Sequence, residues 1–230
     1  MRITLLAARV LFIICLPIAI FTATVGLAFN SLSLYKFDFR KNDISAVTGI
    51  SLSELDNAAR DIIRYWNSGE EWIDTVVKKD GQPFTLFNER EIVHFKDVKS
   101  LVRLDYAALA VTGLYCMGYA SFTLRQRKPG YRRELALAGL GGSLLSLVIL
   151  ATLGIAAAVD FNGFWWQFHL ISFANDFWLL DPRTDYLIMM FPEGFWLDGV
   201  IIIAGVSAAV AIFIGGLAWA YLRRNRQSPD

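Results

Sequence analysis

The sequence predicts an α-helical integral membrane protein with four transmembrane helices, a small extracytoplasmic α/β cap and an aromatic-rich outer loop. Three observations support this fold class: hydrophobic residues make up 55% of the 230 residues, they fall into four long runs, and short basic segments flank those runs. This composition is typical of a polytopic helical membrane protein rather than a soluble domain. The formal net charge of +1 gives no indication of an acidic or basic partner.

Four apolar segments are long enough to cross a hydrocarbon core about 30 Å thick, which takes roughly 20 helical residues. We expect transmembrane helices at residues 5–28, 104–124, 135–159 and 200–222. A proline within the first segment, Pro17, is tolerated as a kink in a spanning helix. A cleaved signal peptide is the alternative for this segment, but its apolar run exceeds the roughly 7 to 15 residues of a signal sequence and no A-x-A-like site precedes Asn30.

The orientation follows from lysine and arginine in short loops, which face the cytoplasm. These cations are Arg2, Arg125, Arg127, Lys128, Arg132, Arg133, Arg223, Arg224 and Arg226. The loop at residues 125–134 and the tail at residues 223–230 are therefore expected in the cytoplasm. Both termini then lie inside, and residues 30–103 and 160–199 lie outside.

Residues 30–103 are expected to form a small globular cap. The alternation in SLSLYKFDFR predicts a strand, and Ser53 is a plausible N-cap for a helix that ends at Gly69. The pair Asp80-Gly81 predicts a turn. After it, FNEREIVHFKDVKSLVRLDY reads as one helix that continues into the second span.

This last helix carries His94, one of only two histidines in the chain. Glu91 lies three residues before His94 and Asp97 three residues after it, so both carboxylates border its face of the helix. A carboxylate partner can fix the tautomer of an imidazole and hold it ready to accept a proton. Ordinary ion pairing on a solvated helix is the other interpretation, and the spacing leaves both open.

The outer loop at residues 160–199 is dense in tryptophan and phenylalanine. Aromatic rings gather at membrane interfaces because they are apolar with a polar edge. The sequence therefore predicts a re-entrant or interfacial loop anchored by Trp165, Trp166, Trp178, Phe195 and Trp196.

The second histidine, His169, lies in this outer loop. Ser172 and Asp176 follow it at helical spacing, and a polar cluster at residues 181–185 comes after them. His94 is 11 residues from Asp105 and His169 is ten residues from Val159, so continued helices would place each roughly 15 Å beyond its span. With a tilt or a bend, both imidazoles reach the ester level of a lipid.

Several chemistries lack their sequence signatures. No G-x-S-x-G, P-loop or H-E-x-x-H motif occurs, and no nucleic-acid-binding module is recognisable. The spans carry no mid-membrane charges, which disfavours a transporter. A metal site made of His94, His169 and a carboxylate such as Asp97 or Asp181 is conceivable, but no local ligand spacing supports it.

Two segments, FNEREIVHFKDVK and FHLISFANDFWLLDPRTDYLIMMFPEGFW, together with four spans, resemble the bacterial lipoprotein intramolecular transacylase (Lit) family. The resemblance implies a multi-pass protein of the bacterial plasma membrane with an extracytoplasmic site. It implies transfer of the sn-2 acyl chain of a diacylglyceryl-cysteine to the α-amino group of that cysteine. The implied partners are a diacylated lipoprotein N-terminus and membrane lipid, and the two functional histidines would be His94 and His169.

Histidine fits this chemistry because a neutral imidazole can take a proton from an α-amine and return it to the leaving glycerol oxygen. No cofactor and no metal is required. The choice of base and acid stays open, and Asn88, Trp178 or a backbone N–H could stabilise the oxyanion. The expected supporting residues are Asn88, Glu91, Asp97, Asp176, Trp178, Asp181 and Asp185.

The competing hypothesis is a non-enzymatic membrane protein whose aromatic outer face docks a lipid or protein partner. Acyl transfer requires lateral entry of the substrate, because moving an acyl chain into water costs about 0.8 kcal/mol per CH₂. We therefore expect an apolar groove that runs from the level of the histidines into the hydrocarbon zone. The sequence carries no signal of oligomeric state.

Overall fold

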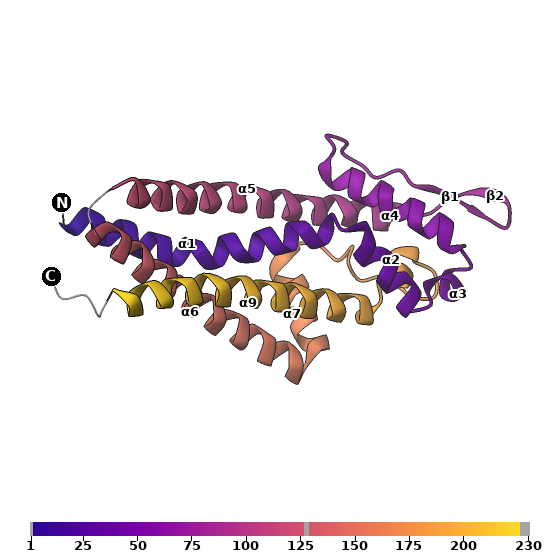
Figure 1. Ribbon diagram of the computed structural model, residues 1–230. Coiled ribbons are helices and arrows are strands. Elements are labelled where there is room, and N and C mark those ends of the chain that lie inside the picture. The colour runs from indigo at the N-terminus through magenta and orange to yellow at the C-terminus, as the bar shows by residue number, and fades with distance from the viewer. Residues whose placement is uncertain (1, 127–128, 226–230) are drawn as a thin grey trace. The chain divides into compact units, whose positions relative to one another are not determined.

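The computed structural model describes residues 2–126 and 129–225 (Figure 1). Its elements are α1 (Arg2–Phe29), α2 (Leu32–Lys41), α3 (Ile44–Thr48), α4 (Leu52–Asn67), β1 (Val76–Lys79), β2 (Gln82–Thr85), α5 (Glu89–Arg125), α6 (Pro129–Val159), α7 (Phe161–Ser172), α8 (Tyr186–Met190) and α9 (Glu193–Arg224). Among the cations expected to set the orientation, Arg127, Lys128 and Arg226 lie outside the described residues.

The chain divides into two compact units. The membrane unit comprises Met1–Val25, Asp105–Ala158 and Ile202–Asp230, and the cap unit comprises Gly26–Leu104 and Val159–Ile201. Both histidines and every supporting residue expected from the sequence belong to the cap unit.

Four helices, α1, α5, α6 and α9, are long and apolar enough to cross a membrane. Together with the short antiparallel sheet, they confirm the predicted fold class of a four-helix membrane protein with an α/β cap.

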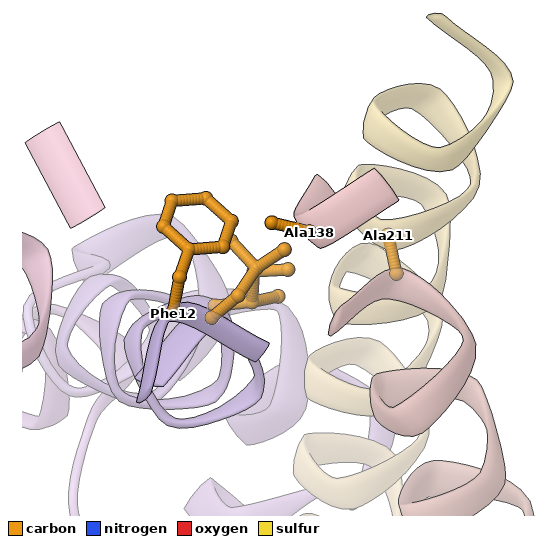
Figure 2. Close-up of a cluster of buried hydrophobic side chains, with 5 residues drawn as sticks. Phe12, Ala138 and Ala211 are labelled. Atoms are coloured by element: carbon orange, nitrogen blue, oxygen red, sulfur yellow. The ribbon is translucent and has the colours of Figure 1, made fainter. Parts of the chain in front are cut away.

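The core of the membrane unit packs three large apolar side chains of α1, Phe12, Leu16 and Ile20, against the small side chains Ala138 and Ala211. Figure 2 shows Phe12 of α1 beside Ala138 of α6 and Ala211 of α9. A Cβ atom on Gly142 would lie 2.8 Å from Leu16 Cδ2, so glycine lets α6 approach α1 closely. Van der Waals packing of small residues is the usual means of helix association in lipid.

The predicted strand in SLSLYKFDFR is wrong, because these residues form α2. Ser31 caps the helix through its hydroxyl, which accepts from the Leu34 N–H at 3.4 Å. Tyr35, Asp38 and Phe39 are buried at helical spacing. The apolar residues of this segment alternate as in a strand, but one of them, Phe37, is exposed. The sequence pattern therefore fits a strand or a helix, and packing in the cap unit selects the helix.

The predicted limits of α4 need correction at both ends. Ser51, not Ser53, is the N-cap, and its Oγ accepts from the Glu54 N–H at 3.4 Å. This S-x-x-E pattern is the signature of a capping box. The helix ends at Asn67 with Ser68 as its C-cap, before Gly69.

The predicted turn after α4 is confirmed. Val76–Lys79 pairs antiparallel with Gln82–Thr85. Asp80 and Gly81 join these strands with φ angles of 53° and 78°. Two successive left-handed residues are what a two-residue hairpin turn requires.

Candidate functional site

The start of α5 fixes the position of His94. Asn88 precedes this helix, and its Oδ1 accepts from the Glu91 N–H at 3.1 Å. Glu91 Oε2 in turn accepts from the Asn88 N–H at 2.7 Å, which completes a reciprocal cap. The other oxygen of Glu91 accepts from the Leu187 N–H at 2.6 Å, and this carboxylate is 1% exposed. Glu91 therefore joins the first turn of α5 to α8.

Helix α7 positions His169. Its N-cap is Asp160, whose Oδ1 accepts from the Gly163 N–H at 2.9 Å. His169 Nδ1 lies 2.8 Å from the carbonyl oxygen of Trp165. A carbonyl oxygen can only accept, so this hydrogen bond requires the proton on Nδ1 and leaves the lone pair on Nε2.

The two histidines meet within the cap unit. Their ring centroids are 6.2 Å apart with an interplanar angle of 26°. The ring of Phe173 borders both, with its centroid 4.9 Å from that of His94 and 5.6 Å from that of His169. Trp178 and Trp165 lie against His169 with centroid distances of 4.9 Å and 5.0 Å. Aromatic side chains thus enclose the pair.

This enclosure favours neutral imidazoles. His94 is 7% exposed and His169 is 9% exposed. Burial lowers the pKa of His169 below its ordinary value, and the hydrogen bond to the Trp165 carbonyl offsets part of that effect. At neutral pH the site therefore holds His169 as a proton acceptor.

Unlike Nδ1 of His169, Nδ1 of His94 has no hydrogen-bond partner among the described residues. This atom is buried. Buried polar atoms are nearly always paired, and leaving one unpaired costs about 1–3 kcal/mol. An atom of this kind is a natural contact for a bound substrate.

The carboxylates that flank His94 in sequence serve other contacts. Asp97 Oδ2 accepts from Asn175 Nδ2 at 2.9 Å, and Arg90 donates to the carbonyl of Asp176 at 2.5 Å. These two hydrogen bonds fasten the loop after α7 to α5. In the described part of the chain, neither Glu91 nor Asp97 is hydrogen-bonded to His94.

The expected polar cluster at residues 181–185 forms, but among the described residues it makes no hydrogen bond with either imidazole. Asp185 Oδ2 accepts from the Asp181 N–H at 2.8 Å, and its Oδ1 accepts from Asn88 Nδ2 at 3.1 Å. Asp181 pairs with Arg183, which lowers the pKa of that carboxyl to about 2. One N–H of the Asn88 amide donates to Asp185, whereas Trp178 lies against His169, so Trp178 is the better-placed side-chain candidate for an oxyanion donor.

Two aromatic residues beside the histidines are what sequence reasoning missed. Trp178 was expected to support the site and packs on His169, but Trp165 was expected only as an interfacial anchor and Phe173 was not singled out. Part of the signal was present, since Trp165 and His169 are four residues apart and share one face of α7, whereas Phe173 directly follows the helix as its C-cap. Asn175 had no such signal, because its contact with Asp97 bridges segments far apart in sequence.

An open cavity of about 560 Å³ lies beside the start of α5, lined by Asn88, Glu89, Arg90, Val93 and Phe177. Neither histidine lines it, so the apolar groove expected for lateral entry stays a prediction. Within residues 2–126 and 129–225, no three histidine, cysteine or acidic side chains are grouped as metal ligands.

Comparison with models of known protein families shows which family this chain belongs to. The family model described as lipoprotein intramolecular transacylase Lit matches residues 10–196. The chain belongs to the Lit family. Among curated proteins, no match was found.

Solved structures of a Lit protein share the fold. The membrane-integral lipoprotein intramolecular transacylase Lit from Bacillus cereus superposes with a TM-score of 0.80 at 17% identity, covering 99% of this chain and 100% of that one. Two variants of the same bacterial protein, each with one histidine replaced, superpose with TM-scores of 0.76 at 19% and 18% identity. These cover 98% of this chain and 96% and 95% of theirs. The Lit family assignment and the integral membrane architecture anticipated from the sequence are thereby confirmed.

Proposed function

We propose that this Lit-family protein moves the sn-2 acyl chain of a diacylglyceryl-cysteine to the α-amino group of the same lipoprotein. The observation that carries the proposal is the buried pair of imidazoles 6.2 Å apart, one of which has its tautomer fixed. Two adjacent neutral imidazoles can serve a reaction that removes one proton and delivers another.

His169 is the proposed base. Its Nε2 accepts a proton from the amine as the nitrogen attacks the ester carbonyl carbon, and a tetrahedral intermediate forms. When this intermediate collapses, the bond from the carbonyl carbon to the glycerol oxygen breaks and that oxygen receives the proton. The products are an amide on the cysteine nitrogen and a free glycerol hydroxyl, so atoms and charges balance.

His94 is the proposed partner. Its unpaired Nδ1 offers a hydrogen bond to the reacting ester or to the departing oxygen. Trp178, which lies against His169, is the proposed oxyanion donor through its indole N–H. The other expected residues hold α5 and the loop after α7 in position and do not act on the substrate directly. They are Asn88, Glu91, Asp97, Asp176, Asp181 and Asp185.

The reaction needs no cofactor in this proposal, because an ester is exchanged for a more stable amide. The amine and the ester belong to one molecule, which supplies the proximity that an enzyme otherwise arranges. The distribution of lysine and arginine supports a site on the extracytoplasmic face with both termini in the cytoplasm.

The test uses purified protein in lipid vesicles with a synthetic diacylated lipopeptide. After incubation, mild base removes ester-linked acyl chains but leaves an amide-linked chain, and mass spectrometry reads the N-terminus. We expect one acyl chain to remain on the amine, and only when the protein is present. Loss of both chains in every sample would contradict acyl transfer and favour the docking hypothesis.

A further inference from the structure

A second cavity of the cap unit carries an unusual concentration of positive charge. It measures about 150 Å³ and lies where the segment after α4 meets α5. Lys96, Lys99 and Arg103 line it and share one face of α5, since they are three and four residues apart. None of these residues belongs to the histidine site.

Lys99 is the buried member of this group. It is 3% exposed, and its Nζ donates to the carbonyl of Glu70 at 2.7 Å and to Ser68 Oγ at 3.2 Å. The ring of Tyr65 lies 3.8 Å away. Two of the three N–H donors of the ammonium are thus engaged by neutral acceptors and its remaining side lies over the Tyr65 ring, so its positive charge is not balanced by these contacts. Within the described residues no carboxylate lies at ion-pairing distance from Lys99.

The other charges around the cavity do not neutralise it. Lys96 pairs with Glu71 at 2.6 Å, while Arg103 donates to the carbonyl of Ser68 at 3.2 Å. The lining therefore holds three cations against the two carboxylates of Glu70 and Glu71, an excess of one positive charge. A buried ammonium with neutral acceptors is costly, and an anion would compensate it.

The cations of this cavity lie close to the expected start of the second span. Arg103 directly precedes the apolar residues expected to begin the span at residue 104. Lys99 lies four residues farther along the helix, roughly 6 Å at about 1.5 Å per residue. The headgroup layer of one leaflet is about 5 to 8 Å thick. Lys99 and Arg103 thus lie within one headgroup-layer thickness of the expected start of the span, measured along α5.

We infer that this cavity binds the phosphate group of a phospholipid headgroup, held by Lys99 and Arg103. Basic pockets beside membrane helices are suited to anionic headgroups. Free inorganic phosphate offers the same chemistry, and the experiment distinguishes the two sources. The lipoprotein substrate proposed above carries no phosphate in its diacylglyceryl group, so this site does not depend on acyl transfer.

The experiment measures binding to delipidated protein in detergent by native mass spectrometry and by thermal unfolding. Three probes are compared: phosphatidylglycerol, diacylglycerol with the same acyl chains, and inorganic phosphate. We expect phosphatidylglycerol to bind at least about tenfold more tightly than either of the others and to raise Tm.

Variants locate the site. Lys99→Gln and Arg103→Gln should each weaken phosphatidylglycerol binding about fivefold or more, as expected for removal of one interfacial cation. Lys78→Gln, which removes an exposed cation of the hairpin, should leave binding unchanged. Arg103 is exposed, so its variant keeps the test valid even if Lys99→Gln fails to fold. Equal binding of diacylglycerol, equal binding of inorganic phosphate, or full binding by Arg103→Gln would overturn the inference.

Discussion

The membrane unit and the cap unit satisfy their polar groups in different ways. In the membrane unit, several hydroxyls donate to their own helix one turn back, as Thr22 does to Ile18 at 2.7 Å and Thr112 to Ala108 at 2.6 Å. In the cap unit, Glu91 bonds to Leu187, 96 residues away in sequence. Most of the described membrane-unit hydroxyls are thus paired within their own helix, with few long-range pairs such as Thr24 with Ser207 at 2.7 Å, whereas the cap unit holds distant segments together through buried polar contacts.

This difference indicates where chemistry can be performed. A hydroxyl that donates to its own helix has its proton engaged before tertiary structure forms, so it has no donor left for a ligand. The long-range contacts of the cap unit instead place two imidazoles side by side and leave His94 Nδ1 unpaired. Substitutions in the two units should therefore have very different consequences.

The largest effect is expected for the histidines. His94→Ala or His169→Ala should lower acyl transfer about 100- to 10,000-fold, because each removes a proton-transfer group. Thr152→Ala, which removes a hydroxyl bonded to its own helix in the membrane unit, should keep nearly full activity. Rates come from the base-resistant acyl chain on the lipopeptide. Full activity in either histidine variant would remove that residue from the mechanism.

A large effect on stability is expected for Glu91. Glu91→Ala leaves the N–H groups of Asn88 and Leu187 without their acceptor, at a cost of about 2–4 kcal/mol in the free energy of unfolding. Glu89→Ala, an exposed carboxylate two residues away, is the matched control and should change stability by less than about 0.5 kcal/mol. Denaturant unfolding in micelles measures both, and equal stability of the two variants would show that the long-range bond is unimportant.

A smaller effect, dependent on pH, is expected for Asp38. Burial first, and then the neighbouring Asp198, raise the pKa of this carboxyl from 3.8 to about 7, while Lys41 acts in the opposite direction. Between about pH 4 and pH 7 the folded state therefore holds a proton that the unfolded state has released, and the stability linked to that proton is lost progressively over this range.

Asp38→Asn tests this account, because it keeps the shape and removes the ionisation. Its Tm should exceed that of the wild-type protein at pH 8 and approach it only near pH 4, where the unfolded carboxyl also holds its proton. Asp74→Asn, at an exposed position, should follow the wild-type profile. Parallel profiles for Asp38→Asn and the wild-type protein would show that Asp38 does not titrate in this range.

The smallest effect is expected for the basic loop between the second and third spans. Replacing Arg127 and Lys128 with glutamine should leave turnover nearly unchanged, because these cations orient the protein and have no catalytic task in this account. Activity is compared only in samples whose orientation has been checked by protease access. A strong loss in correctly oriented protein would implicate the other face of the membrane.

Hydropathy and turn chemistry predicted most of the fold, because both act locally. The apolar runs anticipated four long helices, and Asp80-Gly81 anticipated the hairpin. Helix α2 was missed because its short apolar pattern fits two periodicities and burial of Tyr35 and Phe39 chooses between them. The start of α4 was displaced because Ser51 and Ser53 are both good caps, and only Ser51 has a glutamate three residues on.

The candidate site was predictable in part for a similar reason. The matched distances of His94 and His169 from their spans predicted their proximity. The partners of the nearby carboxylates were not predictable, because Asn175 and Leu187 meet α5 only through tertiary folding. Composition alone assigned Trp165 to the membrane interface. In the structure it packs on the imidazole of His169.

The most direct test of the central claim is a double-mutant comparison of the two histidines. If both serve one proton-transfer sequence, groups that act as a unit should be strongly non-additive. The variant with both His94→Ala and His169→Ala should then transfer acyl chains at a rate within about tenfold of the slower single variant. A double variant whose loss equals the product of the two single losses would show that the histidines act independently, and the proposed pair would be contradicted.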